Sequence, residues 1–159
     1  KISEILGVEP ILIDSKTLSA QGRRRLYWTN IPNVKQPENK GLTLKDIIQP
    51  TEENVYKCKW ELWNGTENER FIGTIDHGGF EKEKRIQNLN FPSTCLTTFC
   101  RTFSLYEGKI HKVSPVECER LQTLPDNYTE GISKTARLTA IGNGWTCDVI
   151  AHILKSMVF

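Results

Sequence analysis

The sequence has no apolar run long enough to span a membrane, and no signal-peptide pattern opens it. These absences argue against a membrane-embedded or secreted protein, so we expect an intracellular one. Apolar residues make up 38% and charged residues 25%, which is ordinary for a globular protein. The net charge of +2 is too small to indicate a nucleic-acid partner by itself.

Cysteine pairs are missing as well. The five cysteines stand apart in the sequence, at Cys58, Cys95, Cys100, Cys118 and Cys147. An odd count without a Cys-x-x-Cys pair favours reduced thiols over a disulfide framework. The three histidines are equally scattered, at His77, His111 and His152. We therefore expect no zinc site.

An N-terminal methionine is also absent. The chain opens at Lys1, and residues 2–6 have the apolar spacing of a helix whose last turn is followed by Gly7, a typical left-handed cap. A chain of 159 residues that opens inside a helix is expected to be a C-terminal fragment or a subunit.

The N-terminal third predicts strands and a linker. Residues 10–14 and 26–31 are rich in β-favouring side chains, and the second run ends at Pro32. Residues 33–42 have the composition of a linker, and Thr43 can cap a short helix over 44–48.

The middle of the chain, residues 51–113, shows little helical periodicity and predicts a small β-rich domain. Its β-like runs are residues 55–56, 60–63, 71–75 and 95–99. Residues 81–85 are all charged, which is typical of a solvated surface loop.

Helical signals return near the C-terminus. Ser114 and Glu117 have the spacing of a capping box, with Pro115 at the first helical position, and predict a helix to about Leu124. A last helix is expected from about Thr146. Its apolar face comprises Val149, Ile150, Ile153, Leu154 and Met157.

Three polar segments could carry function. Gln21, Arg23 and Arg25 share one face of an extended chain, which suits an anion or a pyrimidine carbonyl, or else a basic turn in water. The Gly142–Trp145 segment could cradle the polar end of a cofactor or form a tight turn. Between them, Thr97, Thr98 and Arg101 could contact DNA, or belong to a plain amphipathic strand.

These segments resemble blocks of the DNA (cytosine-5) methyltransferases. Gln21-Gly22-Arg23-Arg24-Arg25 is similar to the Gln-x-Arg-x-Arg block of bacterial and phage enzymes, and its surroundings are similar to the catalytic domain of the vertebrate de novo enzymes. Residues 114–128 and 141–145 resemble the last two blocks of the family. In the family, the first of these blocks supports the recognition domain, and the second helps to bind S-adenosylmethionine.

The resemblance implies a role for each matching residue. Arg25 would contact the ring carbonyl of a cytosine flipped out of the duplex, and Arg23 would support the catalytic loop. Asn143, Gly144 and Trp145 would bind the cofactor. Residues that would contact DNA are Gln21, Thr97, Thr98 and Arg101.

The chain lacks the other half of that chemistry. Methyl transfer to carbon 5 of cytosine needs a cysteine nucleophile, which the family carries in a Pro-Cys motif, and an acid in Glu-Asn-Val. No cysteine here follows a proline, so the Pro-Cys motif is absent, and so is the family's Gly-rich cofactor turn. The letters Glu-Asn-Val occur once, as Glu53-Asn54-Val55, in the middle region of the chain that does not match the family. The nucleophile would come from an N-terminal catalytic half on the same or a separate chain.

The resemblance implies an α/β fold. We expect the C-terminal part of a Rossmann-like, S-adenosylmethionine-dependent methyltransferase with a small β-rich target-recognition domain. Residues 1–32 would end the catalytic domain, 33–140 would form the recognition domain, and 141–159 would return to the catalytic domain.

The expected function is that of part of a DNA cytosine-5 methyltransferase, inactive alone, with double-stranded DNA as partner. The alternative is a non-catalytic subunit that binds DNA or stimulates a methyltransferase. A bacterial or phage origin and a cytoplasmic location are favoured over the nucleus, since no chromatin-reading module is visible.

Overall fold

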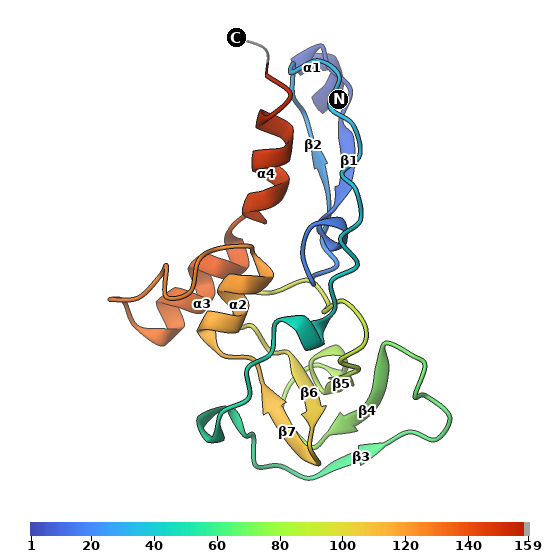
Figure 1. Ribbon diagram of the computed structural model, residues 1–159, viewed down its shortest axis with the longest axis vertical. Coiled ribbons are helices and arrows are strands. Elements are labelled where there is room, and N and C mark those ends of the chain that lie inside the picture. The colour runs from blue at the N-terminus through green and yellow to red at the C-terminus, as the bar shows by residue number, and fades with distance from the viewer. Residues whose placement is uncertain (158–159) are drawn as a thin grey trace.

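In the part of the chain that the structure describes, the fold consists of two separate sheets and four α-helices, with the sheets at opposite ends of the molecule (Figure 1). The computed structural model describes the backbone of residues 1–157 and their side chains other than that of Lys82. Residues 158 and 159, the end of the predicted closing segment, lie outside the described residues.

The first sheet is an antiparallel pair, β1 (Ile11–Asp14) and β2 (Arg24–Tyr27), with Ile13 opposite Arg25. The second sheet has five strands in the order β3-β4-β5-β6-β7. These are β3 (Trp60–Leu62), β4 (Phe71–Ile75), β5 (Arg85–Gln87), β6 (Phe103–Tyr106) and β7 (Lys109–Lys112). Only β5 and β6 run parallel, because their connection crosses over through residues 88–102.

The helices are α1 (Ile2–Leu6), α2 (Pro115–Leu121), α3 (Lys134–Asn143) and α4 (Cys147–Leu154). Helix α1 ends at Gly7, whose φ of 67° is left-handed as predicted. Helix α2 begins at the predicted capping box, in which Ser114 and Glu117 each bond the other's backbone N–H. No helix in the described part of the chain is long and apolar enough to cross a membrane.

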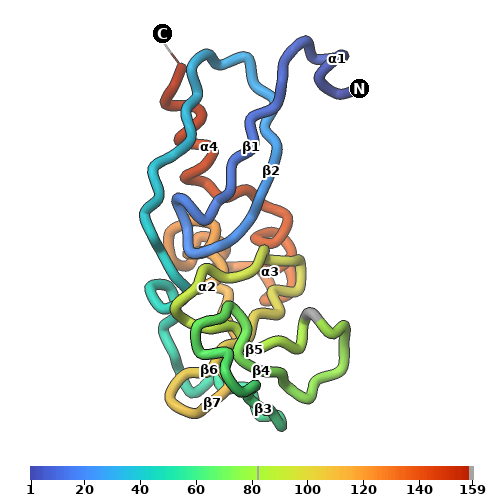
Figure 2. Tube along the Cα trace, turned by 90° about the vertical axis from the view of Figure 1, so that its right-hand side faces the viewer, coloured from blue at the N-terminus to red at the C-terminus, as the bar shows by residue number. Residues whose placement is uncertain are grey.

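The two ends of the chain share one core. Ile13 and Leu18 pack against Val149 and Ile153, so that α4 lies beside the β1–β2 hairpin in both views (Figures 1 and 2). A second core lies between the sheets, beneath α2 and α3. Its buried members are Ala20, Leu44, Leu96, Cys100, Val113, Cys118, Leu121 and Ile141. A third core is formed by strands of the five-stranded sheet, and its buried members are Ile75, Ile86, Phe103 and Ile110.

Several predicted elements differ from the structure. Strand β2 begins at Arg24 rather than Leu26, and the helix predicted at 44–48 is a single 3-10 turn, Leu44–Asp46. Residues 95–99 form no strand, although the chain there is packed between other segments. Helix α3 was not predicted, because its apolar residues form no continuous stripe and only Ile141 and Gly142 are buried.

Candidate DNA and cofactor site

Arg23 lies at the centre of a buried cluster of hydrogen bonds. It is only 7% exposed, and its guanidinium donates to four groups from two distant segments. Nη1 bonds the Cys95 thiol at 3.2 Å and the Leu96 carbonyl at 3.3 Å. Nη2 bonds the Gly142 and Gly144 carbonyls at 3.2 and 3.0 Å. One planar cation therefore joins the hairpin, the 95–96 segment and the end of α3.

Gln21 takes part in the same cluster. Its side chain is fully buried, and its amide oxygen accepts from the Leu96 N–H at 2.8 Å. Its amide nitrogen donates to the Leu121 carbonyl and to the side-chain oxygen of Gln122, both at 3.1 Å. We call Gln21, Arg23 and Gln122, with the backbone groups they bond, the junction network. Since the Gln21 side chain is buried and both of its polar atoms are already paired, the structure offers DNA no access to it.

Arg25 is placed quite differently. It is exposed, with Nη1 bonding the adjacent Arg24 carbonyl at 2.8 Å and Nη2 lying 3.6 Å from the Cys95 sulfur. The Cys95 thiol thus lies between the two guanidiniums of Arg23 and Arg25. Arg25 keeps donors that are free to meet a ligand.

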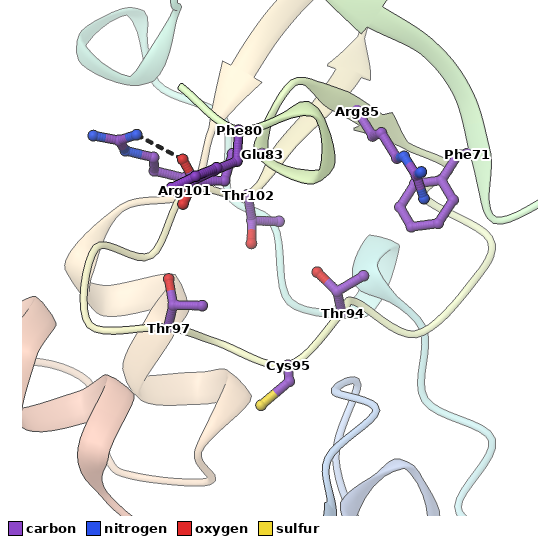
Figure 3. Close-up of a pocket in the computed structure, with 9 residues that line it drawn as sticks. All are labelled: Phe71, Phe80, Glu83, Arg85, Thr94, Cys95, Thr97, Arg101 and Thr102. Atoms are coloured by element: carbon purple, nitrogen blue, oxygen red, sulfur yellow. Dashed lines mark hydrogen bonds and ion pairs between the residues drawn. The ribbon is translucent and has the colours of Figure 1, made fainter. Parts of the chain in front are cut away.

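A groove of about 540 Å³ opens beside Cys95. We call it the recognition groove. Its lining residues are Phe71, Phe80, Glu83, Arg85, Thr94, Cys95, Thr97, Arg101 and Thr102. Figure 3 shows Arg101 with Glu83 on one side and Arg85 with Phe71 on the other, while the Cys95 sulfur points out of the groove, where Arg23 and Arg25 bond it. Thr97 is exposed on the wall, whereas Thr98 is half-buried and does not line the groove.

The Gly142–Trp145 segment turns its backbone inward and two side chains outward. Gly142 and Asn143 are the last turn of α3, and Gly144 has an ordinary φ of −67°, so the tight turn considered from the sequence is not there. The Gly142 and Gly144 carbonyls face Arg23, whereas Asn143 is exposed and Trp145 is 66% exposed. Trp145 lines a largely apolar groove of about 520 Å³ along α4.

Gly142 is required by packing. An added Cβ would overlap the backbone carbonyl of Thr97, so α3 and the 97–98 segment touch backbone to backbone. The close approach that this glycine permits is therefore to the backbone of Thr97 and Thr98 and not to a ligand.

Two buried glutamates fix α2. His111 Nε2 lies 3.0 Å from both oxygens of Glu117, and Glu119 bonds Thr129 and, at 2.9 Å, Arg137. Burial opposes ionisation of both carboxyls. Their hydrogen bonds outweigh it and hold the pKa of Glu117 and of Glu119 below its usual range.

Comparison with known proteins decides the family. The model of the C-5 cytosine-specific DNA methylases matches residues 66–158, more than half of the chain. The chain belongs to the C-5 cytosine-specific DNA methylase family.

Individual methylases agree with that assignment. The chain is 26% identical over 164 residues to the DNA (cytosine-5)-methyltransferase DRM2 of Oryza sativa subsp. japonica, an alignment that covers 95% of this chain and 27% of that protein. It is 24% identical over 153 residues to the type II methyltransferase M.SsoII of Shigella sonnei, covering 87% and 40%. The chain thus spans well under half the length of these relatives.

A solved methyltransferase shares the fold. The structure of the Entamoeba histolytica methyltransferase EhMeth superposes with a TM-score of 0.64 at 14% identity, covering 98% of this chain and 56% of that one. The predicted fold class, part of an α/β methyltransferase with a β-rich region, is confirmed.

Two features of this methylase chain were not predicted from its sequence. Glu83 belongs to the charged run 81–85, which was interpreted as a surface loop, yet it lines the recognition groove together with the preceding Phe80. Cys95 was noted only as a scattered thiol, and no local signal shows that it lies between two arginines. No group of three or more potential metal ligands occurs among the described residues.

Proposed function

We propose that this chain is the C-terminal part of a DNA cytosine-5 methyltransferase. The complete enzyme would transfer the methyl group of S-adenosylmethionine to carbon 5 of a flipped cytosine, with a nucleophilic cysteine from an N-terminal half. The observation that carries the proposal is the shared contact at Cys95. It joins exposed Arg25 to the recognition groove, so that a base held by Arg25 would lie beside DNA bound in the groove.

The two arginines would have separate roles. Exposed Arg25 would donate to the ring carbonyl of the flipped cytosine and orient it. Buried Arg23 is a positioning residue, because all of its observed partners are protein groups that hold the 95–96 segment and the end of α3 in place.

The cofactor would meet the outward side chains of Asn143 and Trp145. The exposed indole of Trp145 offers an apolar surface, and the exposed amide of Asn143 can bond a polar group. These residues fit part of S-adenosylmethionine, which supplies the methyl group when bound. Gly144 would contribute through its backbone position between them.

DNA would lie over the recognition groove. Thr97 and Arg101 face it directly, and Thr98 would contact DNA at its edge. For Gln21 we propose a positioning role in the junction network rather than a DNA contact. The packing of α4 on the β1–β2 hairpin supports the division in which residues 1–32 and 141–159 belong to the catalytic domain and 33–140 to the recognition domain. An enzyme of this kind would work inside the cell, on DNA.

The test is complementation. The chain is mixed with a separately expressed N-terminal half of a related enzyme that carries the Pro-Cys motif and the Gly-rich turn, and transfer of labelled methyl to DNA is measured. We expect activity only with both halves. Arg25→Ala should lower it about a hundredfold, whereas Arg24→Ala, which changes an exposed neighbour on the same strand, should leave it within threefold.

The same assay separates the alternative function. A chain that binds duplex DNA and stimulates a complete methyltransferase, with no effect of Arg25→Ala, would be a non-catalytic subunit. Methyl transfer by the isolated 159-residue chain would contradict the proposal from the opposite side, since we expect it to be inactive alone.

A further inference from the structure

An acidic side chain stands in the groove that we propose for DNA. Glu83, in the 3-10 turn Glu81–Glu83, accepts from Arg101 with 2.6 Å between Oε2 and Nη1. The two side chains are 20% and 33% exposed, and both line the recognition groove (Figure 3). A carboxylate here repels phosphate, so it lowers affinity for every DNA sequence alike.

The ion pair is held by two neighbours, the Gly79 backbone and the Phe99 ring. A Cβ placed on Gly79 would lie 3.0 Å from both Arg101 Nη1 and Glu83 Oε2, so the Gly79 backbone packs directly against the pair. Gly79 also has a φ of 138°, which disfavours any side chain there. The Arg101 guanidinium also lies over the Phe99 ring, 5.4 Å from its centre. The orientation of the guanidinium is therefore set before any ligand arrives.

The chemistry of the pair matches that of a G·C base pair. A guanidinium donates in bidentate fashion to O6 and N7 of guanine, and a carboxylate can accept from N4 of cytosine. Arginine carries five N–H donors, and the bond to Glu83 uses only one of them, on Nη1. The other donors remain for a base edge.

We propose that Glu83 and Arg101 form a base-reading pair that selects a G·C base pair near the target cytosine. Arg101 contacts the guanine, while Glu83 holds Arg101 in its reading orientation and weakens its binding to phosphates of other sequences. The position near the target follows from the contact between Arg25 and Cys95, which lines the same groove. This inference rests on the proposed function, because it takes the groove to be the DNA-facing surface.

The experiment is a selection from duplexes randomised on both sides of one fixed cytosine, at one fixed salt concentration, followed by binding measurements. The 159-residue chain is compared with Glu83→Gln, Arg101→Lys and the control Glu81→Gln. Glu81 lies in the same turn and pairs with Lys84, but does not line the recognition groove. Thermal unfolding verifies that each variant folds like the parent.

The unmodified chain should enrich a G·C pair at one position. Glu83→Gln should bind unrelated duplexes about threefold to tenfold more tightly and lose about tenfold of that preference. Arg101→Lys keeps the charge but lacks the planar fork, so it should lose the preference while still binding unrelated duplexes. Glu81→Gln should match the parent within twofold.

Two results would overturn the inference, and they differ. If the chain binds duplex DNA but Glu83→Gln and Glu81→Gln select the same sequences with the same affinity, the pair reads no base, and the proposed function stands. If the folded chain binds no duplex at all, the groove is not a DNA surface, and the DNA-recognition part of the proposed function fails with it.

Discussion

The junction network contains Arg23, whereas Arg25 from the same block is exposed beside the recognition groove, and the two arginines share a neighbour. Arg23 and Arg25 both reach the Cys95 sulfur. Arg23 is buried, with four bonds to groups from two distant segments, whereas exposed Arg25 has one bond to the adjacent carbonyl and the distant thiol contact. Burial therefore decides which arginine holds the fold and which one is available to a ligand.

Among the substitutions that test this comparison, Arg23→Ala should reduce the free energy of unfolding most. The substitution removes a buried cation and leaves the carbonyls of Leu96, Gly142 and Gly144 without that donor. We expect a loss of about 3 kcal/mol in the free energy of unfolding, or about 10 °C in Tm, measured by urea and thermal denaturation.

The control for this substitution is Arg24→Ala at the exposed neighbour, which should change stability by less than about 0.5 kcal/mol. If Arg23→Ala unfolds like the parent chain, the junction network does not hold the segments together.

A smaller effect is expected from Gly142→Ala. Helix propensity alone would make alanine stabilising by about 1 kcal/mol. Its Cβ, however, would overlap the Thr97 carbonyl, which is backbone and cannot rotate away. We therefore expect a loss of about 2 kcal/mol. Asn143→Ala, on the exposed side of the same turn, is the matched control, and a stabilised Gly142→Ala would contradict the backbone contact.

Gly142 also shows where prediction from the sequence ended. Features fixed by neighbouring residues were predicted correctly, such as the capping box of Ser114 and Glu117, the left-handed Gly7 and strand β4. Features that depend on residues far along the chain were not predicted. Position 142 needs a glycine because the Thr97 backbone packs against it, and no residue near position 142 in the sequence indicates this contact.

The same limit applies to the candidate site. The charged run at 81–85 was interpreted as a solvated loop, because the partner of Glu83 is Arg101, far along the chain. The pattern Gln21-x-Arg23-x-Arg25 identified the right residues, but spacing on a strand could not show that two of them are buried and one is exposed. Burial arises from the segments packed against the strand, which the local pattern does not contain.

Acid should destabilise the packing around α2, which holds the two buried glutamates Glu117 and Glu119. The folded-state pKa values of Glu117 and Glu119 are lowered, so their contribution to stability is complete above the unfolded value of about 4.3 and is lost as pH falls through the folded values. We expect Tm to be level near neutral pH and to fall below about pH 4.5.

Glu119→Gln tests the source of that acid sensitivity. It should cost about 1–2 kcal/mol at neutral pH, because the buried bonds from Thr129 and Arg137 lose their charged partner. It should also make the decline in acid shallower. An unchanged pH profile in this variant would assign the acid sensitivity to other carboxyls.

The smallest change in stability is expected for Arg25→Ala. This variant gives the most direct test of the contrast between buried Arg23 and exposed Arg25. Its guanidinium is exposed, and its bonds to the Arg24 carbonyl and the Cys95 thiol are exposed as well. Removing it should change the free energy of unfolding by less than about 0.5 kcal/mol. Urea denaturation of Arg25→Ala beside Arg23→Ala measures the difference directly. Equal losses in the two variants would mean that Arg25 also holds the fold, and its availability to a flipped base would then have no structural basis.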